Sequence, residues 1–390
     1  MGNRVAIVGV GRTPHTSHRP DVNHIEMINE AVRAALEDAE LDIKDVDAVL
    51  CGNMDHFEGH YLADAMAVDG SGAFLKPGMK MSTGGTVGSV MFLSAWFHVA
   101  SGLYDTVLSV AYQKHDEAPA TSAMMAGWDP FYERGMMTGA VGFLSHYALR
   151  YIEETGATEE HAAMVRVMQS EGAAGNPYAH SRQKVTVDDV LNSRMVVYPM
   201  RLLTICPTSS GAAAIVVASE KKAKKITNKP VWVKDHITVH RENFTPICDV
   251  GPYRFPESTQ RVAARKLFSR NGITNPRKEF QLFELYDPTS WAILHWSEDF
   301  LIFDKGEAWK AAEKRVMSLE GEFPICPSGG VTCTNAIGSS GTTRVIEAAL
   351  QIRGDAGDHQ VTRDVKKALV SGYGGANWTD LIILQRNLSD

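Results

Sequence analysis

Two glycine-rich turns, far apart in the chain, most constrain how it can fold. The first spans residues 82–89 and opens an almost wholly apolar run over residues 90–100. The second spans residues 328–341 and leads into a helical pattern over residues 344–353. Each turn places backbone N–H groups and the positive end of a helix dipole at one point. Two such turns predict a duplicated α/β scaffold with its chemistry between the two halves.

Composition and charge exclude several classes of protein. The chain has 390 residues, of which 44% are hydrophobic and 22% charged, as in ordinary globular proteins of one large or two smaller domains. The net charge of −7 argues against general binding to nucleic acid or to anionic membranes. No apolar run approaches the roughly 20 residues that span a bilayer. The N-terminus shows no secretory signal, so we expect a cytoplasmic protein.

The cysteines suggest free thiols. There are five of them, an odd number without metal-ligand pairing, which fits a reducing compartment and predicts no metal site and no tightly bound cofactor. They are Cys51, Cys206, Cys248, Cys326 and Cys333. Cys206 precedes a proline and a strand, and its position suggests a structural role.

Apolar runs and turn residues give a similar order of elements in both halves. In the first half we expect strands over 4–9, 47–51, 106–111 and 212–218, and helices over 25–40 and 90–100. A basic linker over 221–229 separates the halves. The second half begins with residues 231–239 and continues with a helix over 261–270, a strand over 280–285, the second turn with its helix, and a strand over 368–370. This repeated order divides the chain into residues 1–228 and 229–390.

A segment of different character, about residues 115–190, interrupts the first half. It is rich in methionine, glycine and aromatic residues, including Met124, Met125, Met136, Met137, Trp128, Phe131 and Tyr132. Two helices are expected within it, over 141–154 and 159–172. It is interpreted either as an insertion that shapes the substrate site or as a second small core or subunit contact.

The chain resembles the thiolase superfamily over essentially its whole length. The resemblance is carried by motifs that occur in the order and spacing of that family: residues 5–9 with Thr13 and Pro14, the first glycine turn, residues 210–214, Tyr286 with Asp287, residues 327–330 with 338–341, and residues 372–375. It is most similar to the sterol-carrier-type branch, which includes benzoylsuccinyl-CoA thiolase and the retro-aldolases of steroid side chains. The resemblance implies a duplicated, five-layered αβαβα fold with an inserted loop domain, a homodimeric core and coenzyme A thioesters as substrates. It also implies a small partner protein with a zinc ribbon and an OB fold.

The departures from the family pattern concern the catalytic residues. Thiolases carry a nucleophilic cysteine in the first glycine turn, and the alignment of that turn puts Gly85 at the cysteine position. The Gly-His-Pro of the second turn falls on residues 334–336, so Asn335 replaces the histidine. Tyr286 and Asp287 occupy the place of the usual Asn-Glu or His-Asp pair. The last loop carries Tyr373 where a second cysteine is common. The usual cysteine–histidine–cysteine set is therefore not expected here.

Reactions at the carbon beside a thioester need an enolate oxygen to be stabilised, at about 3 kcal/mol for each good hydrogen-bond donor. The candidate donors are the N–H of Gly85, the turn at Gly374 and Gly375, and the amide of Asn335. An asparagine amide donates N–H as a neutral histidine does. The alternative for Asn335 is a turn residue that bonds its own backbone.

Tyr286 and Asp287 follow an apolar strand and precede a proline, which predicts a position at a strand end, where ligands of α/β proteins bind. Tyr286 is a candidate to protonate or deprotonate a substrate oxygen, or else a tyrosine packed at a domain seam. Asp287 is a candidate catalytic residue or an orienting group for its loop. Tyr373, between glycines, is expected to point into a cavity.

Two further candidates are Cys333 and His115. Cys333 is the thiol of the second turn, close ahead of a helix where a thiolate is favoured, so it is a candidate relocated acyl acceptor. The alternative is a small buried apolar residue. His115 follows the strand over 106–111 and is expected either to line the pocket or to be an ordinary loop residue.

Three functions remain open. The first is a thiolase-like enzyme that cleaves or forms the C–C bond of a bulky or aromatic β-oxoacyl-CoA with coenzyme A, as one subunit of a complex. The second is a retro-aldolase on a β-hydroxyacyl-CoA, which needs acid and base groups and no covalent cysteine. The third is a catalytically silent subunit that binds coenzyme A or a partner, since the fold alone does not select between these.

Overall fold

The computed structural model describes residues 2–59, 63–131, 134–135, 139–240, 257–374 and 378–389. Nine strands follow one another in the order β3-β2-β4-β7-β1-β8-β11-β10-β9. Their bounds are β1 Val5–Arg12, β2 Ala48–Gly52, β3 Gly78–Met81, β4 Thr106–Gln113, β7 Gly211–Ser219, β8 Val231–Val239, β9 Leu282–Glu284, β10 Lys367–Gly374 and β11 Trp378–Gln385.

The two halves of this strand order repeat the same pattern. In the first half β2 is parallel to β4, and β7 lies antiparallel between β4 and β1. In the second half β9 is parallel to β10, and β11 lies antiparallel between β10 and β8. Between β1 and β8 only two residue pairs join the halves, Ala6 with Trp232 and Ile7 with Val231. The predicted duplication is confirmed.

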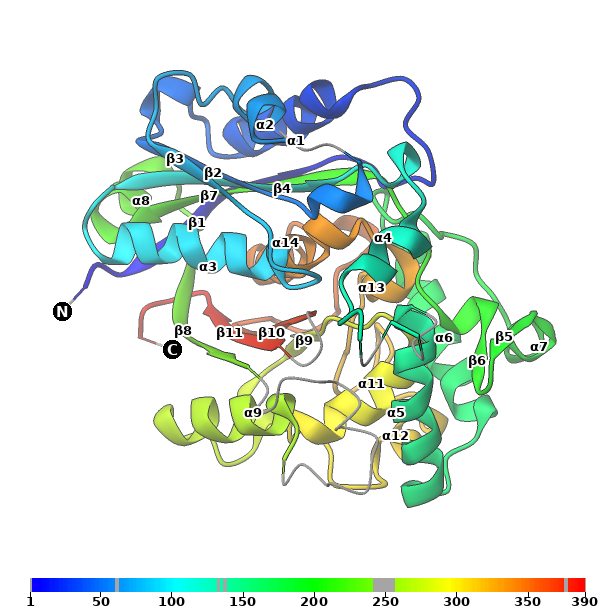
Figure 1. Cartoon of the computed structure of the whole chain (residues 1–390). Coiled ribbons are helices and arrows are strands. Elements are labelled where there is room, and N and C mark those ends of the chain that lie inside the picture. Colours follow the sequence, from blue (N-terminus) through cyan, green and yellow to red (C-terminus); the bar gives the residue numbers. More distant parts are fainter. Residues whose placement is uncertain are drawn as a thin grey trace.

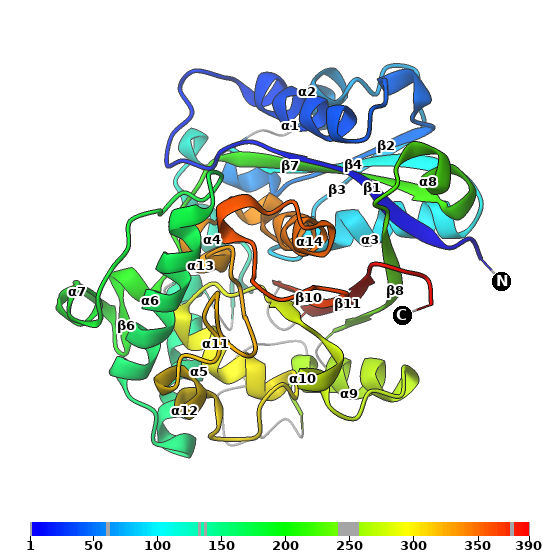
Figure 2. The ribbon, with the colours of Figure 1, turned by 180° about the vertical axis from the view of Figure 1, so that it is seen from behind.

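The sheets and helices form five layers (Figure 1). Helices α1 (His24–Asp38), α2 (Ala63–Ser71) and α8 (Glu220–Ile226) cover the outer face of the first sheet, and α3 (Val87–Ala100) and α14 (Ile337–Arg353) lie between the sheets. Helices α9 (Thr259–Arg270) and α11 (Ser290–Asp299) cover the outer face of the second sheet, as the reverse view also shows (Figure 2). This is the αβαβα architecture that the resemblance to the thiolases implied.

Three apolar clusters separate these layers. One lies between α1 and the first sheet, with Met27 and Ile28 facing Val8. The central one packs α3 and α14 between both sheets, and the third lies between the second sheet and its outer helices. Strand β1 is buried along its whole length, because helices cover both of its faces. Within the described ranges, no helix is both long and apolar enough to cross a membrane.

Glycine lets the two central helices approach each other closely. A Cβ added at Gly88 on α3 would lie 2.6 Å from the backbone nitrogen of Thr342 on α14. A Cβ added at Gly341 would lie 2.5 Å from the backbone nitrogen of Ser89. The Thr342 hydroxyl donates to the Gly88 carbonyl at 2.8 Å. The helix that follows each glycine turn is thus in contact with its counterpart from the other half.

The inserted segment contributes helices, the first of which packs against residues 55–57 and the next two against α11. These are α4 (Ala120–Ala126), α5 (Ala140–Thr155), α6 (Glu159–Gly175) and the start of α7 (Val187–Asn192), which is followed by a small hairpin of β5 (Met195–Val197) and β6 (Met200–Arg201). The helices expected over 141–154 and 159–172 correspond to α5 and α6. Tyr132, Met136 and Met137, singled out in the sequence, lie outside the described residues. The other α-helices of the described residues are α10 (Pro276–Glu279), α12 (Ala308–Glu313) and α13 (Gly330–Cys333).

Two local predictions were wrong. The expected linker over 221–229 is largely helix α8, where Ala223 is buried and Lys224 pairs with Glu220 one turn away. Strand β10 is longer than the expected 368–370 and reaches Gly374, because it pairs along its length with β11. Tyr373 therefore belongs to a strand and is only 7% exposed. The division at residues 228 and 229 falls between α8 and β8, and it stays a prediction.

Gly88→Ala is expected to destabilise the protein, because the new methyl group has only backbone atoms of α14 to displace. Overpacking of this kind costs about 1–3 kcal/mol, which corresponds to a fall in melting temperature of roughly 1–4 °C for a chain of 390 residues. Gly127→Ala is the control, since the added Cβ there would meet its nearest atom at an ordinary 3.4 Å. Equal melting temperatures for both variants in calorimetry would contradict the close helix contact.

Candidate active site

A cavity of about 460 Å³ opens where the two glycine turns meet. Its lining includes Gly85 of the first turn, Asn335 of the second turn and Gly374 at the end of β10. Most of the wall is apolar, and its larger side chains are Trp128, Phe143, Leu144, Ile205, Ile337 and Trp378. The lining also includes the polar side chains of His56, Thr83, Cys206, Tyr286, Asn335 and Tyr373. Residues of the inserted segment therefore line the cavity together with residues of both halves.

Gly85 and Gly374 bring the backbones of the two halves together. A Cβ added at Gly374 would lie 2.4 Å from the backbone nitrogen of Thr86 and 2.5 Å from the Cα of Gly85. A Cβ added at Gly85 would lie 2.9 Å from the Tyr373 carbonyl oxygen and 3.4 Å from the Tyr286 hydroxyl. Since real Cβ atoms do not approach backbone oxygens this closely, the position of Gly85 has no room for a larger residue unless β10 moves. Gly375 lies outside the described residues.

Asn335 is held at the cavity by four hydrogen bonds. Its backbone N–H donates to the Ser209 hydroxyl at 3.1 Å, and its carbonyl accepts from the Ser209 backbone N–H at 2.9 Å. Its side-chain oxygen Oδ1 accepts from the Ser340 hydroxyl at 2.9 Å. Its Nδ2 donates to Cys206 Sγ at 3.2 Å. The amide hydrogens of Asn335 thus face the thiol side of the cavity, as a donor for a negative oxygen requires.

Tyr286 follows β9 and is 4% exposed. Its backbone N–H donates to the Ser371 hydroxyl at 2.9 Å, which ties the loop after β9 to β10. Burial raises the pKa of Tyr286 well above its usual value, and the neighbouring Cys206 and Asp287 add to the rise. A hydrogen bond with Ser340 opposes it. Tyr286 is therefore a neutral phenol, which can donate one hydrogen bond and accept others inside the cavity.

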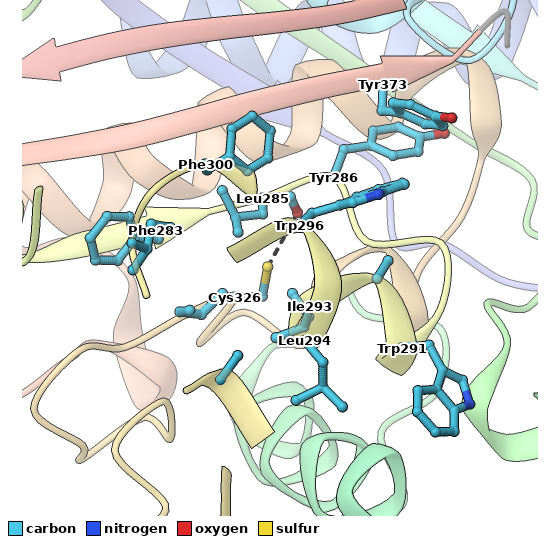
Figure 3. Packing of buried hydrophobic residues seen from close by; sticks show 14 of the residues in the cluster. Phe283, Leu285, Tyr286, Trp291, Ile293, Leu294, Trp296, Phe300, Cys326 and Tyr373 are labelled. Carbon is cyan, nitrogen blue, oxygen red and sulfur yellow. Dashed lines mark hydrogen bonds between the residues drawn. The ribbon is translucent and has the colours of Figure 1, made fainter. Parts of the chain in front are cut away.

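Tyr373 lies on β10, and its ring packs against Trp296 of α11 with 4.4 Å between ring centroids. Figure 3 shows the rings of Tyr286 and Tyr373 directed the same way, with both hydroxyl ends on one side. The prediction that Tyr373 points into a cavity agrees with its place in the lining. Its position is set by a strand and an aromatic contact rather than by a glycine loop.

Asp287 is not part of the cavity lining. Its buried carboxylate accepts from the Val331 backbone N–H at 2.7 Å, from the Thr332 hydroxyl at 2.9 Å and from the Gln169 amide. Burial raises the pKa of Asp287 to about 6, against the opposing effects of Arg344 and these donors. Asp287 therefore holds the start of α13 in place. This agrees with the orienting role considered for it, whereas a catalytic residue would have to contact the substrate.

Cys333 does not fit the predicted role of acyl acceptor. It is fully buried at the end of α13, packs with Ala173 and Ala179, and accepts a hydrogen bond from Arg166 at 3.2 Å. Burial raises the pKa of this thiol to about 11. It is absent from the residues that line the cavity. The helix dipole expected to favour a thiolate does not help, because α13 ends at Cys333 rather than beginning after it.

His115 also lies away from the cavity lining. It is 6% exposed, and its ring packs edge-on against Phe57 with 5.0 Å between centroids. Burial lowers the pKa of His115 to about 4, so it is a neutral core residue. Instead, the loop after β2 contributes Met54 and His56 to the lining. Both residues follow a buried parallel strand, and this position is the feature of the sequence that could have identified them as cavity residues.

Cys206, which the sequence suggested to be structural, is the thiol that lines the cavity among the described residues. Burial raises its pKa to about 12, while the hydrogen bond from Asn335 opposes the rise. Nothing in its local sequence, a cysteine before a proline, indicated this position. Among the described residues, no group of three or more His, Cys, Asp or Glu side chains could hold a metal ion.

Comparison with known proteins identifies relatives of this chain. Residues 255–386 match the family model described as "Thiolase C-terminal domain-like". The chain is 33% identical over 371 residues to an acetyl-CoA acetyltransferase of Methanothermobacter thermautotrophicus, covering 92% of this chain and 93% of that protein. It is 28% identical over 381 residues to the benzoylsuccinyl-CoA thiolase subunit BbsB of Thauera aromatica, covering 96% of each.

A lyase and an aldolase are also among the similar proteins. The 17-hydroxy-3-oxo-4-pregnene-20-carboxyl-CoA lyase of Mycobacterium tuberculosis is 28% identical over 369 residues, covering 91% of this chain and 92% of that protein. The solved structure of an Ltp2-ChsH2(DUF35) aldolase matches with a TM-score of 0.83 and 24% identity, over 99% of both chains. This likeness shows that the two chains share a fold.

Treatment of the native protein with iodoacetamide is expected to label Cys206 before Cys51, Cys326 and Cys333. Burial raises the pKa of both Cys206 and Cys333 far above neutral pH, so the thiolate fraction does not set the order. Exposure decides the order instead, because Cys206 is half-buried at a cavity and the other three are 5% exposed or less. Peptide mass spectrometry over time measures it. Earlier labelling of Cys333 would contradict the placement of these thiols.

Proposed function

The chain belongs to the thiolase family, and from that premise we propose that it is a retro-aldolase that cleaves a β-hydroxyacyl-CoA with a bulky apolar acyl group. No cysteine intermediate is formed. The observation that carries this proposal is the contact at Gly85, where a Cβ would lie 2.9 Å from the Tyr373 carbonyl oxygen. The position at which the family carries its nucleophilic cysteine is therefore filled by the backbone of the other half.

The proposed reaction needs only acid–base groups and oxyanion donors. The β-hydroxyl group gives its proton to the Tyr286 oxygen as that phenol passes its own proton on toward the α carbon, the bond between the α and β carbons breaks, and its electron pair passes into a thioester enolate. A proton then returns to the α carbon, so the products are a ketone or aldehyde and a shortened acyl-CoA. Tyr286 and Tyr373 are the proposed proton-transferring groups. Asn335 and the backbone at Gly85 and Gly374 are the proposed donors to the enolate oxygen.

The cavity wall supports a bulky apolar acyl group. Trp128, Phe143 and Leu144 come from the inserted segment, and Ile337 and Trp378 from the second half. Apolar walls with a few polar groups at one end are typical of sites that bind the body of a ligand by burial and orient it by hydrogen bonds. The names of the lyase and the aldolase among the similar proteins are compatible with this substrate class.

A second candidate is the thiolase reaction on a β-oxoacyl-CoA with Cys206 as the acyl acceptor. The observation that favours it is the N–H···S hydrogen bond of 3.2 Å from Asn335 to Cys206 in the cavity. Covalent catalysis needs a thiolate, and the raised pKa of Cys206, about 12, weighs against it. A silent binding subunit is the third possibility, and the enclosed tyrosines give it no specific support.

We also propose a homodimer and a small partner protein with a zinc ribbon and an OB fold. Strand β3 ends the sheet, with Met79 47% exposed, and Phe74 and Leu75 just before it are exposed too. An exposed apolar edge strand is a template for pairing with another chain, here a second copy. The partner protein is supported by the name of the solved Ltp2-ChsH2(DUF35) aldolase and by the word subunit in that of BbsB.

Tyr286→Phe and Tyr373→Phe are each expected to lower kcat for release of a ketone or aldehyde by about 100-fold or more, because each removes a proton-transferring group. Cys206→Ala and Cys333→Ala are the controls and should stay within about threefold of the wild type, since no covalent thiol is needed. The assay follows carbonyl product and acyl-CoA by mass spectrometry over a panel of β-hydroxyacyl-CoA thioesters. Loss of turnover in Cys206→Ala, with acylated Cys206 in the wild type, would favour the thiolase reaction instead.

Met79→Glu is expected to convert a dimer into single chains, because each copy would bring a buried negative charge to the same paired edge. Light scattering after size-exclusion chromatography gives the mass directly. Lys278→Gln, which changes the net charge by the same −1 on the surface at α10 of the other half, is the matched control. A wild-type protein that is already monomeric, or a Met79→Glu protein that remains dimeric, would contradict pairing through β3.

A further inference from the structure

We propose that Gln169, a buried residue of α6, is a positioning residue through which the inserted segment fixes Tyr286 and Asn335 at the cavity. The inference deepens the proposed function and rests on it, since it assigns what holds two groups of that same site. Gln169 is 3% exposed and is absent from the cavity lining. It therefore acts through a neighbour, and that neighbour is Asp287.

Helix α6 lies beside the second glycine turn (Figure 1 and Figure 2). A Cβ added at Gly172 of this helix would lie 2.1 Å from the Pro327 carbonyl oxygen. The side chain of Asn176, at the C-terminal end of α6, donates to the Ser328 carbonyl at 3.0 Å. Because the backbones are in contact, no side chain lies between the helix and the turn to absorb a shift. The position of α6 is therefore passed on to the turn.

The Gln169 amide joins this helix to the loop after β9. Its Nε2 donates to Asp287 Oδ2 at 2.5 Å, and its Oε1 accepts from the Ser290 hydroxyl at 3.4 Å. The two ends of an amide can be exchanged by rotation, but an ionised carboxylate only accepts hydrogen bonds. The carboxylate of Asp287 therefore requires the nitrogen end of Gln169 to face it.

Asp287 connects Gln169 to the second glycine turn. Its Oδ1 accepts from the Val331 backbone N–H at 2.7 Å, and its Oδ2 accepts from the Thr332 hydroxyl at 2.9 Å. A Cβ added at Gly330 would lie 2.3 Å from Oδ2, so only glycine leaves room for the carboxylate at that point. The carboxylate is thus shared between α13 and the inserted segment, with Gln169 as the donor from the latter.

Two cavity residues lie next to this arrangement in the chain. Tyr286 directly precedes Asp287, and Asn335 follows the end of α13 by two residues. The proposed phenol and the proposed oxyanion donor are therefore attached to the two segments that Asp287 joins. A displacement of about 1 Å, even when it originates away from the chemistry, can lower a rate by about 100-fold. We therefore expect loss of the Gln169 bond to be felt at both residues.

The charges at this point favour a neutral donor on α6. Burial raises the pKa of Asp287 to about 6, while Arg344 and the donors of α13 oppose the rise. A carboxyl group in place of Gln169 would bring a like charge to Asp287, which raises the pKa of both groups. The titratable and charged groups around this pair are Arg166, Cys206, Glu284, Tyr286, Cys326, Cys333 and Arg344.

The first test measures stability and needs no turnover. Gln169→Glu keeps the size of the side chain, and its carboxyl group can still donate to Asp287 while it holds a proton. A carboxyl whose pKa is higher in the folded chain than in the unfolded chain loses stability as pH rises. The melting temperature of Gln169→Glu should therefore fall by about 3 °C or more relative to wild type between about pH 6 and pH 9.

Exchange of the two side chains is the matched rescue. In the double variant Gln169→Glu with Asp287→Asn, the carboxylate and the amide trade places. The new amide oxygen can accept from Val331, and its nitrogen can donate to the carboxylate on α6. The alkaline fall in melting temperature should therefore disappear in this variant.

The second test is kinetic. Gln169→Leu should lower kcat for carbonyl release by about tenfold, with at most about a threefold change in KM, because it acts on groups that stabilise the transition state. Gln169→Glu should show this loss only at alkaline pH, and the exchanged pair should regain most of it. Calorimetric titration with a saturated acyl-CoA, which has no β-hydroxyl group, should show binding weakened by about threefold in Gln169→Leu even where nothing is cleaved.

The next residue of α6 provides a control. Ser170 is fully buried, and its hydroxyl donates to the Val167 carbonyl at 2.7 Å and accepts from the Val185 backbone N–H at 3.2 Å. Ser170→Ala therefore removes a buried polar group from the same helix without touching Asp287. Its kcat, its affinity for acyl-CoA and the pH dependence of both should stay close to those of the wild type.

The outcomes separate the inference from the function on which it rests. The same pH dependence of melting temperature in wild type and Gln169→Glu, or no rescue in the exchanged pair, would overturn the bond to Asp287 whatever the reaction is. Rescued stability with unchanged kcat and unchanged acyl-CoA affinity in Gln169→Leu would overturn the positioning role. Rescued stability and weakened acyl-CoA binding, in a wild type that releases no ketone or aldehyde, would support the positioning role and contradict the proposed reaction.

Discussion

The contact between the two glycine turns is the constraint on which the rest of the structure depends. Gly85 lies against Gly374, and Gly88 lies against the start of α14, at distances that leave no space for a Cβ. Because these are contacts between backbones, they fix where both central helices begin. They also bring Asn335, Tyr286 and Tyr373, which are far apart in sequence, to the wall of one cavity.

Buried ion pairs also hold these elements in place. Arg344 of α14 pairs with Glu284 at the end of β9, next to Tyr286, and also bonds the Ser328 hydroxyl of the second glycine turn at 2.6 Å. One turn further along α14, Glu347 pairs with Arg12 of β1 in the other half. Removing one member of such a pair leaves an uncompensated buried charge and costs about 3–5 kcal/mol. The site is therefore held by rigid elements, as groups that transfer protons within a small space require.

Glycine spacing and apolar runs predicted a duplicated α/β scaffold with its chemistry between the halves, and the resemblance to the thiolases implied the five layers. The sequence also predicted Gly85, Gly374, Asn335, Tyr286 and Tyr373 as site residues, and the structure brings these together. Contacts between residues far apart in the sequence decided where the other candidate residues lie. Cys333 has the sequence context of a reactive thiol but ends a short buried helix, whereas Cys206 has none and reaches the cavity through a loop. Asp287 follows Tyr286 directly, yet points to α13 because adjacent residues of an extended segment face opposite ways.

The most direct measurement is a crystal structure with a non-cleavable β-hydroxyacyl-CoA analogue bound. We expect an unmodified Cys206, the thioester oxygen within hydrogen-bond distance of Asn335 Nδ2, and the β-hydroxyl group beside the Tyr286 oxygen. An analogue bonded covalently to Cys206, or bound away from the junction of the two glycine turns, would contradict it.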